Sequence, residues 1–140
     1  MLMPSMDIVT EARSWLGVKW LHQGRSREGV DCAGLVIKVA HGLGLTDFDT
    51  ADYARQATDE TMLGLCREHL TPISLADIEP GDVLVMRFDN QRHIGIAGDY
   101  LYGGLSLIHA YASARQVVEH RLDSVWLARV IGAFRFPEAA

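Results

Sequence analysis

The sequence is poor in cysteine and proline and carries no surplus of positive charge. Two cysteines and four prolines occur among its 140 residues, and two cysteines are too few for a disulfide framework. Thirteen Lys and Arg face eighteen Asp and Glu, which gives a net charge of −5 at pH 7. This sign opposes attraction to nucleic-acid phosphates and to anionic lipids, so we expect neither nucleic acid nor membrane as a partner.

Long apolar runs are also missing. No run approaches the ~20 residues that a membrane-spanning helix needs. The N-terminal segment MLMPSMDIVTEARSW has no basic region and no continuous apolar region, so we expect synthesis in the cytoplasm without a Sec signal. The length and the 49% hydrophobic content predict a single domain over residues 1–140 with a sizeable core.

Helical patterns precede strand patterns along the chain. Apolar spacing predicts helices over 5–16 with Ser5 as N-cap, over 31–43 with Asp31 as N-cap and Gly44 at the end, and over 59–69. The segment between the first two helices lacks a period and is predicted to be a loop. Strand-like runs separated by turn residues follow at 83–88, 94–97, 105–110, 117–120 and 130–136. This order predicts an α+β fold with N-terminal helices packed on an antiparallel sheet of about five strands.

Cys32 is the first candidate for chemistry. It lies at the expected start of a helix, where unpaired amides and the helix dipole favour a thiolate. A small buried core residue is an equally good interpretation of this position alone. Cys66 lies on the apolar face of a predicted helix, so we expect it in the core.

Two of the six histidines are related by symmetry. His93 and His109 are equidistant from Leu101, the centre of the predicted connection over 98–104. We therefore expect them directly opposite one another on neighbouring strands, with Cβ atoms roughly 4.5–5.5 Å apart. A cysteine nucleophile needs a base and a group that orients the base, and this pair would supply both. The other histidines are expected to be mostly structural or solvated; they are His22, His41, His69 and His120.

Four segments carry a family resemblance: LGVKWLHQGRSREGVDCAGLV at 16–36, GDVLVM at 81–86, HIGIAGD at 93–99 and LIHAY at 107–111. Together they resemble the NlpC/P60 cysteine peptidases. The resemblance implies a papain-like α+β fold and hydrolysis of peptidoglycan stem peptides, typically between γ-D-glutamate and a diamino acid. It also implies Cys32 as nucleophile, His93 as base and His109 as orienting residue, with no cofactor and no metal.

The segment HQGR at 22–25, ahead of GVDCAGL, resembles the branch of the family encoded with phage and gene-transfer-agent tails. The resemblance implies a phage-like tail or baseplate protein as partner. A hydrolase carried in a virion tail acts in the periplasm or cell wall after delivery by the particle. Such delivery agrees with the expected lack of an export signal.

The resemblance also implies a substrate-binding group made of Trp20, His22, Asp31 and Ala33. The family usually has Tyr in place of Trp20 and often Ser in place of Ala33. An indole N–H donates a hydrogen bond but accepts none, so these departures leave the substrate open. Two alternatives remain: a tail-tip structural protein with a degenerate site, and a zinc site formed by Cys32, His93 and His109, which lacks a CxxC-type spacing.

Overall fold

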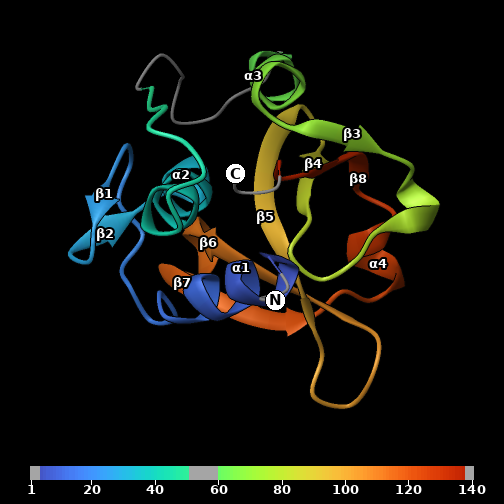
Figure 1. The fold of residues 1–140 in the computed structure, drawn as a ribbon. Helices are drawn as coiled ribbons and strands as arrows, with labels where there is room; N and C mark the ends of the chain where they lie inside the picture. The colour runs from blue at the N-terminus through green and yellow to red at the C-terminus, as the bar shows by residue number, and fades with distance from the viewer. Residues whose placement is uncertain (1–3, 51–59, 138–140) are drawn as a thin grey trace.

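The structure is a computed structural model that describes residues 4–50 and 60–137, and it has the α+β architecture predicted from the sequence (Figure 1). The helices are α1 (Pro4–Arg13), α2 (Cys32–Gly42), α3 (Thr61–His69) and α4 (Ser124–Leu127). An antiparallel sheet of six strands has the order β3-β8-β4-β5-β6-β7. Its strands are β3 (Thr71–Ile73), β4 (Val83–Phe88), β5 (Gln91–Asp99), β6 (Leu105–Tyr111), β7 (Gln116–Arg121) and β8 (Val130–Arg135).

The ends of the helices follow from their sequences. The Asp31 side chain accepts a hydrogen bond from the Gly34 backbone N–H at 2.7 Å, which caps α2 as predicted. Gly44, with φ +68°, follows the end of this helix. Ser5 lies inside α1, which already includes Pro4, so its prediction as N-cap is wrong. The predicted start of the third helix at Asp59 lies outside the described residues.

All five predicted strands are present, and the structure adds three short ones. β3 is an edge strand in which Pro72 lies opposite Phe134; an edge position tolerates a residue without a backbone N–H. β1 (Arg25–Ser26) and β2 (Gly29–Val30) form a separate hairpin in the segment predicted to be a loop. Strands of two or three residues are too short to produce a detectable alternation of apolar and polar residues.

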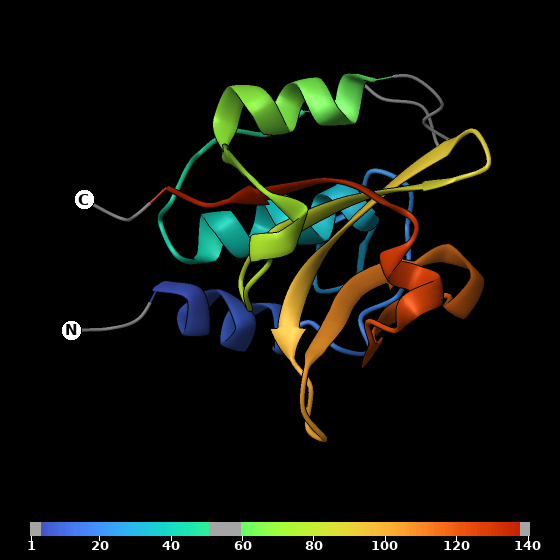
Figure 2. The same cartoon turned by 90° about the vertical axis from the view of Figure 1, so that its right-hand side faces the viewer.

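The centre of the sheet is buried on both faces. Val83 and Val85 of β4 pack in the core under α1 and α2, whereas Leu84 and Met86 pack in a second core on the other face. Trp126 of α4 packs against this second core, and Figure 2 shows α3, α2 and α1 stacked one above another. None of the described helices is long and apolar enough to cross a membrane.

β5 changes its pairing partners along its length. It pairs with β4 over Gln91–Ile96, but with β6 only over Ile96–Asp99. The ladder between β5 and β6 therefore ends at Ile96, and before this residue β5 is paired with β4 alone among the strands of the sheet. The beginning of α2 lies against this part of the sheet, which brings Cys32 and His93 to the same end of the molecule.

Candidate active site

Cys32 is the first residue of α2, as the sequence predicts, and its thiol faces backbone amides. Its sulfur interacts with the N–H groups of Ile94, Ala33 and Cys32 itself. The last two are among the amides that the beginning of a helix leaves without intrahelical partners. Ile94 contributes its amide from β5, directly after His93. The thiol is therefore held where the helix start meets the strand that carries the candidate base.

The charge state of the Cys32 thiol is governed by burial more than by these amides. Burial, together with the neighbouring Asp31 carboxylate, raises the pKa of Cys32 to about 12, although the three amides oppose the shift. The sequence-based expectation of a thiolate at this helix start is therefore not met in the free protein. Cys32 is a neutral thiol at neutral pH and becomes a nucleophile only when a base removes its proton.

His93 and His109 meet, but not through the register predicted from the sequence. Ile96 lies opposite Ile108, so the hairpin is centred on Tyr102 instead of Leu101. His109 comes opposite Gly95, and His93 contacts it diagonally: His93 Nε2 lies 2.6 Å from His109 Nδ1. The prediction of directly opposite residues is wrong, whereas the predicted contact is present. The shift moves each pairing by two residues, so both side chains stay on the same face of the sheet.

Gly95 makes this diagonal contact possible. A Cβ atom at Gly95 would lie 3.0 Å from His109 Cβ and 2.8 Å from Leu107 Cδ1. A larger residue would therefore press on Leu107 and on the carbon that carries the His109 imidazole, and both would have to shift. The glycine is thus required by the close approach of the two strands.

A third histidine, expected from the sequence to be structural or solvated, extends this pair to a row of three histidines: His93, His109 and His120. His109 Nε2 lies 2.8 Å from Nε2 of His120, and His120 Nδ1 lies 2.9 Å from the carbonyl oxygen of Arg121. On β7, Val118 is opposite His109, so His120 lies two residues further along on the same face. The spacing of His109 and His120 around the turn at 112–115 could have signalled this second diagonal contact.

Three aromatic side chains surround these imidazoles. Trp126 contacts both His109 and His120, Tyr111 stacks on His109 with a centroid distance of 5.1 Å, and Phe88 contacts His93 edge-on. His109 is fully buried and His93 is 9% exposed. Burial is the main cause that lowers the pKa of His93 to about 4 and that of His109 to about 2. Both are therefore neutral imidazoles at neutral pH.

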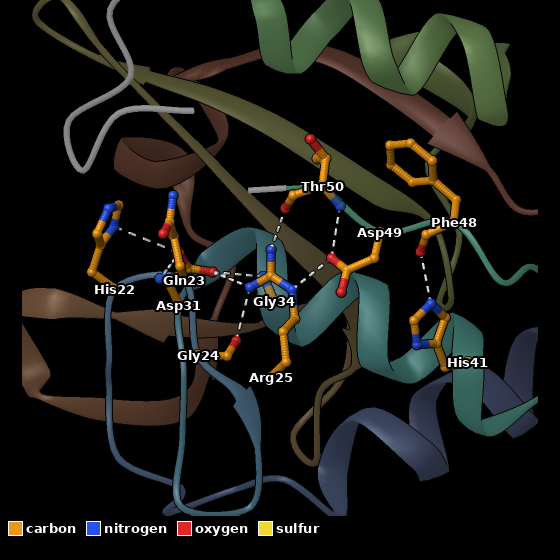
Figure 3. Close-up of polar contacts among 10 residues, drawn as sticks. All are labelled: His22, Gln23, Gly24, Arg25, Asp31, Gly34, His41, Phe48, Asp49 and Thr50. Atoms are coloured by element: carbon orange, nitrogen blue, oxygen red, sulfur yellow. Dashed lines mark hydrogen bonds and ion pairs between the residues drawn. The ribbon is translucent and has the colours of Figure 1, made fainter. Parts of the chain in front are cut away.

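Asp31, predicted to bind substrate, is buried and engaged by its own chain. Its carboxylate accepts hydrogen bonds from the backbone N–H groups of Gly34 and Gln23 and from Arg25 Nη1. Arg25 reaches on to Asp49 Oδ1 at 2.8 Å (Figure 3). The described contacts thus make Asp31 the anchor of the segment before Cys32, and a direct contact with substrate stays a prediction.

The other predicted substrate-binding residues occupy different places. His22 lies beside Asp31, with 3.9 Å between Nδ1 and Oδ2 (Figure 3). Trp20 is partly buried against the core, and its backbone N–H donates to the Arg115 carbonyl. Ala33 lines an apolar cavity that also includes Ile94. The structure thus brings His22 and Asp31 together, whereas substrate contacts of all four residues stay predictions.

The zinc alternative finds no support in the geometry. Both ring nitrogens of His109 lie at hydrogen-bond distance from nitrogens of His93 and His120, so His109 has no lone pair left for a metal. Within residues 4–50 and 60–137, no group of three or more His, Cys, Asp or Glu side chains is arranged to hold a metal ion.

Comparisons with known proteins identify a family and several solved structures that are similar to this chain. The family model described as NlpC/P60 matches residues 17–135. The solved NlpC/p60 domain of the peptidoglycan hydrolase SagA is 24% identical, with a TM-score of 0.63 over 93% of this chain and 97% of that one. At this identity the likeness concerns the fold. A search of curated proteins finds no match.

Two other solved structures share the fold. NlpC2 from Trichomonas vaginalis has a TM-score of 0.70 at 20% identity over 95% of this chain, which spans 47% of that protein. An N-acetylmuramoyl-L-alanine amidase from Bacteroides uniformis has a TM-score of 0.65 at 12% identity, over 96% of this chain and 99% of the other. The architecture described above is therefore shared by proteins of widely different sequence.

Proposed function

Because the chain belongs to the NlpC/P60 family, we propose that it is a cysteine peptidase that hydrolyses an amide bond in the stem peptides of peptidoglycan. One observation carries the proposal. A thiol at the start of a helix lies beside the strand that presents His93, and His93 is hydrogen-bonded to His109 at 2.6 Å. Nucleophile, base and orienting group are the parts that acyl transfer by a cysteine requires.

Covalent catalysis begins with the neutral thiol. Cys32 Sγ bonds to the amide carbonyl carbon while its proton passes to His93, which forms a tetrahedral intermediate. The C–N bond then breaks as His93 returns the proton to the leaving amine, and a thioester remains. Water attacks the thioester with His93 as base. The C–S bond breaks, a carboxylic acid is released, and the thiol regains its proton.

Negative charge develops on the carbonyl oxygen in both tetrahedral intermediates. The backbone N–H of Cys32 lies at the free start of α2 and faces the reacting sulfur. It is the donor best placed to stabilise that charge. Loss of one such donor in well-studied enzymes slows the reaction roughly 10²–10³-fold.

The bond proposed for cleavage joins γ-D-glutamate to a diamino acid. Support comes from the resemblance of Cys32, His93, His109 and their flanking segments to peptidases of the family. One of the solved structures that share the fold is an N-acetylmuramoyl-L-alanine amidase. The bond between muramic acid and L-alanine is therefore a useful second bond to compare. A muropeptide that contains both bonds, digested with the purified chain, distinguishes them by product mass.

Products that end in γ-D-glutamate support the proposal, and free muramic acid would contradict the bond assignment. Loss of all products in Cys32→Ala, with retention in Cys66→Ala, supports Cys32 as the nucleophile. No hydrolysis by the unsubstituted chain would favour the tail-tip structural protein. Cys66 is a suitable control because it is buried in α3, whereas Cys32 is on α2 and the His93–His109 pair is on β5 and β6.

For its place of action, we propose a phage-like tail that delivers the enzyme to the periplasm or cell wall. The support is the resemblance of residues 22–25 to tail-encoded members of the family. Arg25 of this segment begins strand β1 and donates a hydrogen bond to Asp31, the residue before Cys32. Immunoblots of purified particles test the proposal. Enrichment with tail proteins supports it, and confinement of the chain to the cell lysate would contradict it.

A further inference from the structure

The row of three histidines ends at a group that can only accept a hydrogen bond. His120 Nδ1 lies 2.9 Å from the carbonyl oxygen of Arg121. A carbonyl oxygen has no hydrogen to give, so His120 Nδ1 must carry the proton of this contact. A neutral imidazole has one N–H and one acceptor nitrogen, which leaves His120 Nε2 as an acceptor.

The protonation of His120 determines which nitrogen is protonated in His109, and His109 in turn determines it in His93. His109 Nε2 lies 2.8 Å from the acceptor nitrogen of His120, so His109 must donate there and its Nδ1 becomes an acceptor. His93 Nε2 lies 2.6 Å from that nitrogen and must donate in turn. The remaining nitrogen, His93 Nδ1, is then left with a lone pair.

We propose that His120 is a positioning residue that fixes the tautomers of His109 and His93 and thereby keeps His93 Nδ1 unprotonated, ready to accept a proton from the Cys32 thiol. Its role in hydrolysis rests on the proposed function, whereas the tautomers and the reactivity of the thiol can be tested without any peptide substrate. His120 touches neither Cys32 nor the reacting bond and acts only through His109.

The surroundings support neutral His93 and His109. Trp126 contacts the His109 and His120 rings, and Tyr111 stacks on His109, so little water can compete for the nitrogens of the fully buried His109. Burial also lowers the pKa values of His93 and His109. The described contacts of the three imidazoles with one another and with the Arg121 carbonyl contain no carboxylate. A backbone carbonyl therefore has the orienting role that a carboxylate has in a Ser-His-Asp triad.

The first test uses the unaltered chain. Nitrogen-15 NMR of labelled histidine distinguishes a protonated Nδ1 from a protonated Nε2. We expect Nδ1–H for His120 and Nε2–H for His109 and His93 at neutral pH. A protonated Nδ1 on His93 would overturn the proposal, whether or not the chain cleaves peptidoglycan.

The second test compares His120→Leu with His120→Gln. Leucine removes the acceptor, whereas the glutamine carbonyl can still accept from His109 Nε2. Because a wrong imidazole tautomer costs about 10⁴-fold in a serine protease, we expect partial loss of tautomer control to slow iodoacetamide labelling of Cys32 about tenfold or more in His120→Leu. Labelling in His120→Gln should stay within about threefold of the unsubstituted chain, since a hydrogen-bond acceptor is retained.

Mass spectrometry of the Cys32 peptide measures the labelling rate, and His69→Gln on α3 is the control for loss of an unrelated imidazole. The proposal is supported if only His120→Leu is slow and its His93 resonance reports Nδ1–H. Equal rates in all variants, or equal losses in His120→Leu and His120→Gln, would overturn it. If His120→Leu does not fold, the tautomers of the unaltered chain still decide the question.

Discussion

His93 Nε2 and His109 Nδ1 are 2.6 Å apart although the two residues are not directly opposite each other in the sheet. Gly95 occupies the opposite position, and its lack of a side chain leaves room for His109. The candidate base is therefore oriented by a diagonal contact, at the place where β5 separates from β6.

Substitution of Gly95 tests this packing. Gly95→Ala places a methyl group against His109 and Leu107, and overpacking of this kind costs about 1–3 kcal/mol. We expect a lower free energy of unfolding in urea and slower peptide hydrolysis. The matched control is Gly64→Ala on α3, where a Cβ meets no atom within 4 Å. This exposed helical change should stabilise the chain by about 0.5–1 kcal/mol; equal effects at both glycines would contradict the account.

The protonation state of Cys32 has a kinetic signature. Because burial and Asp31 raise the pKa of the thiol to about 12, the thiolate fraction of the free protein grows as pH rises and is small at neutral pH. Alkylation of Cys32 by iodoacetamide should therefore keep accelerating beyond about pH 9, above the usual thiol pKa of about 8.5. A rate that is already constant between pH 5 and 8 would instead reveal a preformed thiolate and imidazolium pair.

Acid should destabilise the fold through the buried histidines. Their usual pKa is 6.5, and burial lowers that of His93 to about 4 and that of His109 to about 2. Between pH 6.5 and 5 the unfolded chain therefore binds protons that the folded chain does not, so stability falls as pH falls. Each histidine adds a slope of up to about 1.4 kcal/mol per pH unit.

Urea unfolding at pH 6.5, 6.0, 5.5 and 5.0 measures this slope. The His93→Gln variant should have a smaller slope, because one of the two contributing imidazoles is gone. A free energy of unfolding that does not change over this range would show that the two rings are not held neutral by the fold.

Asp31 should matter for stability whether or not it contacts substrate. It caps α2 and accepts hydrogen bonds from Gln23 and Arg25 while buried. Loss of a helix cap costs about 1 kcal/mol, and buried donors left without acceptors add about 1–3 kcal/mol. Asp31→Ala should therefore lower the free energy of unfolding by more than Asp123→Ala, which removes an exposed cap of α4. Equal losses would argue against Asp31 as the anchor of this segment.

The sequence predicted the elements with strong patterns and missed those with weak ones. The α2 helix carries a capping residue, an apolar stripe and a terminal glycine, and each of these signals corresponds to an observed feature. The hairpin β1–β2 and the edge strand β3 are too short to show a periodic pattern. Their positions depend on tertiary contacts, such as the pairing of Pro72 with Phe134.

The positions of the candidate site residues were predictable where a local pattern marks them. The sequence placed Cys32 at a helix start and His93 on a strand, as the structure has them, but it did not give the exact register of the hairpin; their catalytic roles stay predictions. β5 continues through Gly98 and Asp99, which the predicted connection included, so the observed connection is shorter at its beginning and its centre moves by one residue. His120 was missed because its contact with His109 depends on that strand geometry and on the next turn.

The central claim is that Cys32 forms a thioester with a peptidoglycan stem peptide while His93 moves the proton. Acid quenching during turnover of a γ-D-glutamyl-diaminopimelate peptide, followed by peptide mapping with mass spectrometry, tests it most directly. We predict an acyl adduct on the peptide that contains Cys32, present also in Cys66→Ala and absent in Cys32→Ala. Undiminished hydrolysis by Cys32→Ala, or an adduct on any other residue, would contradict the account.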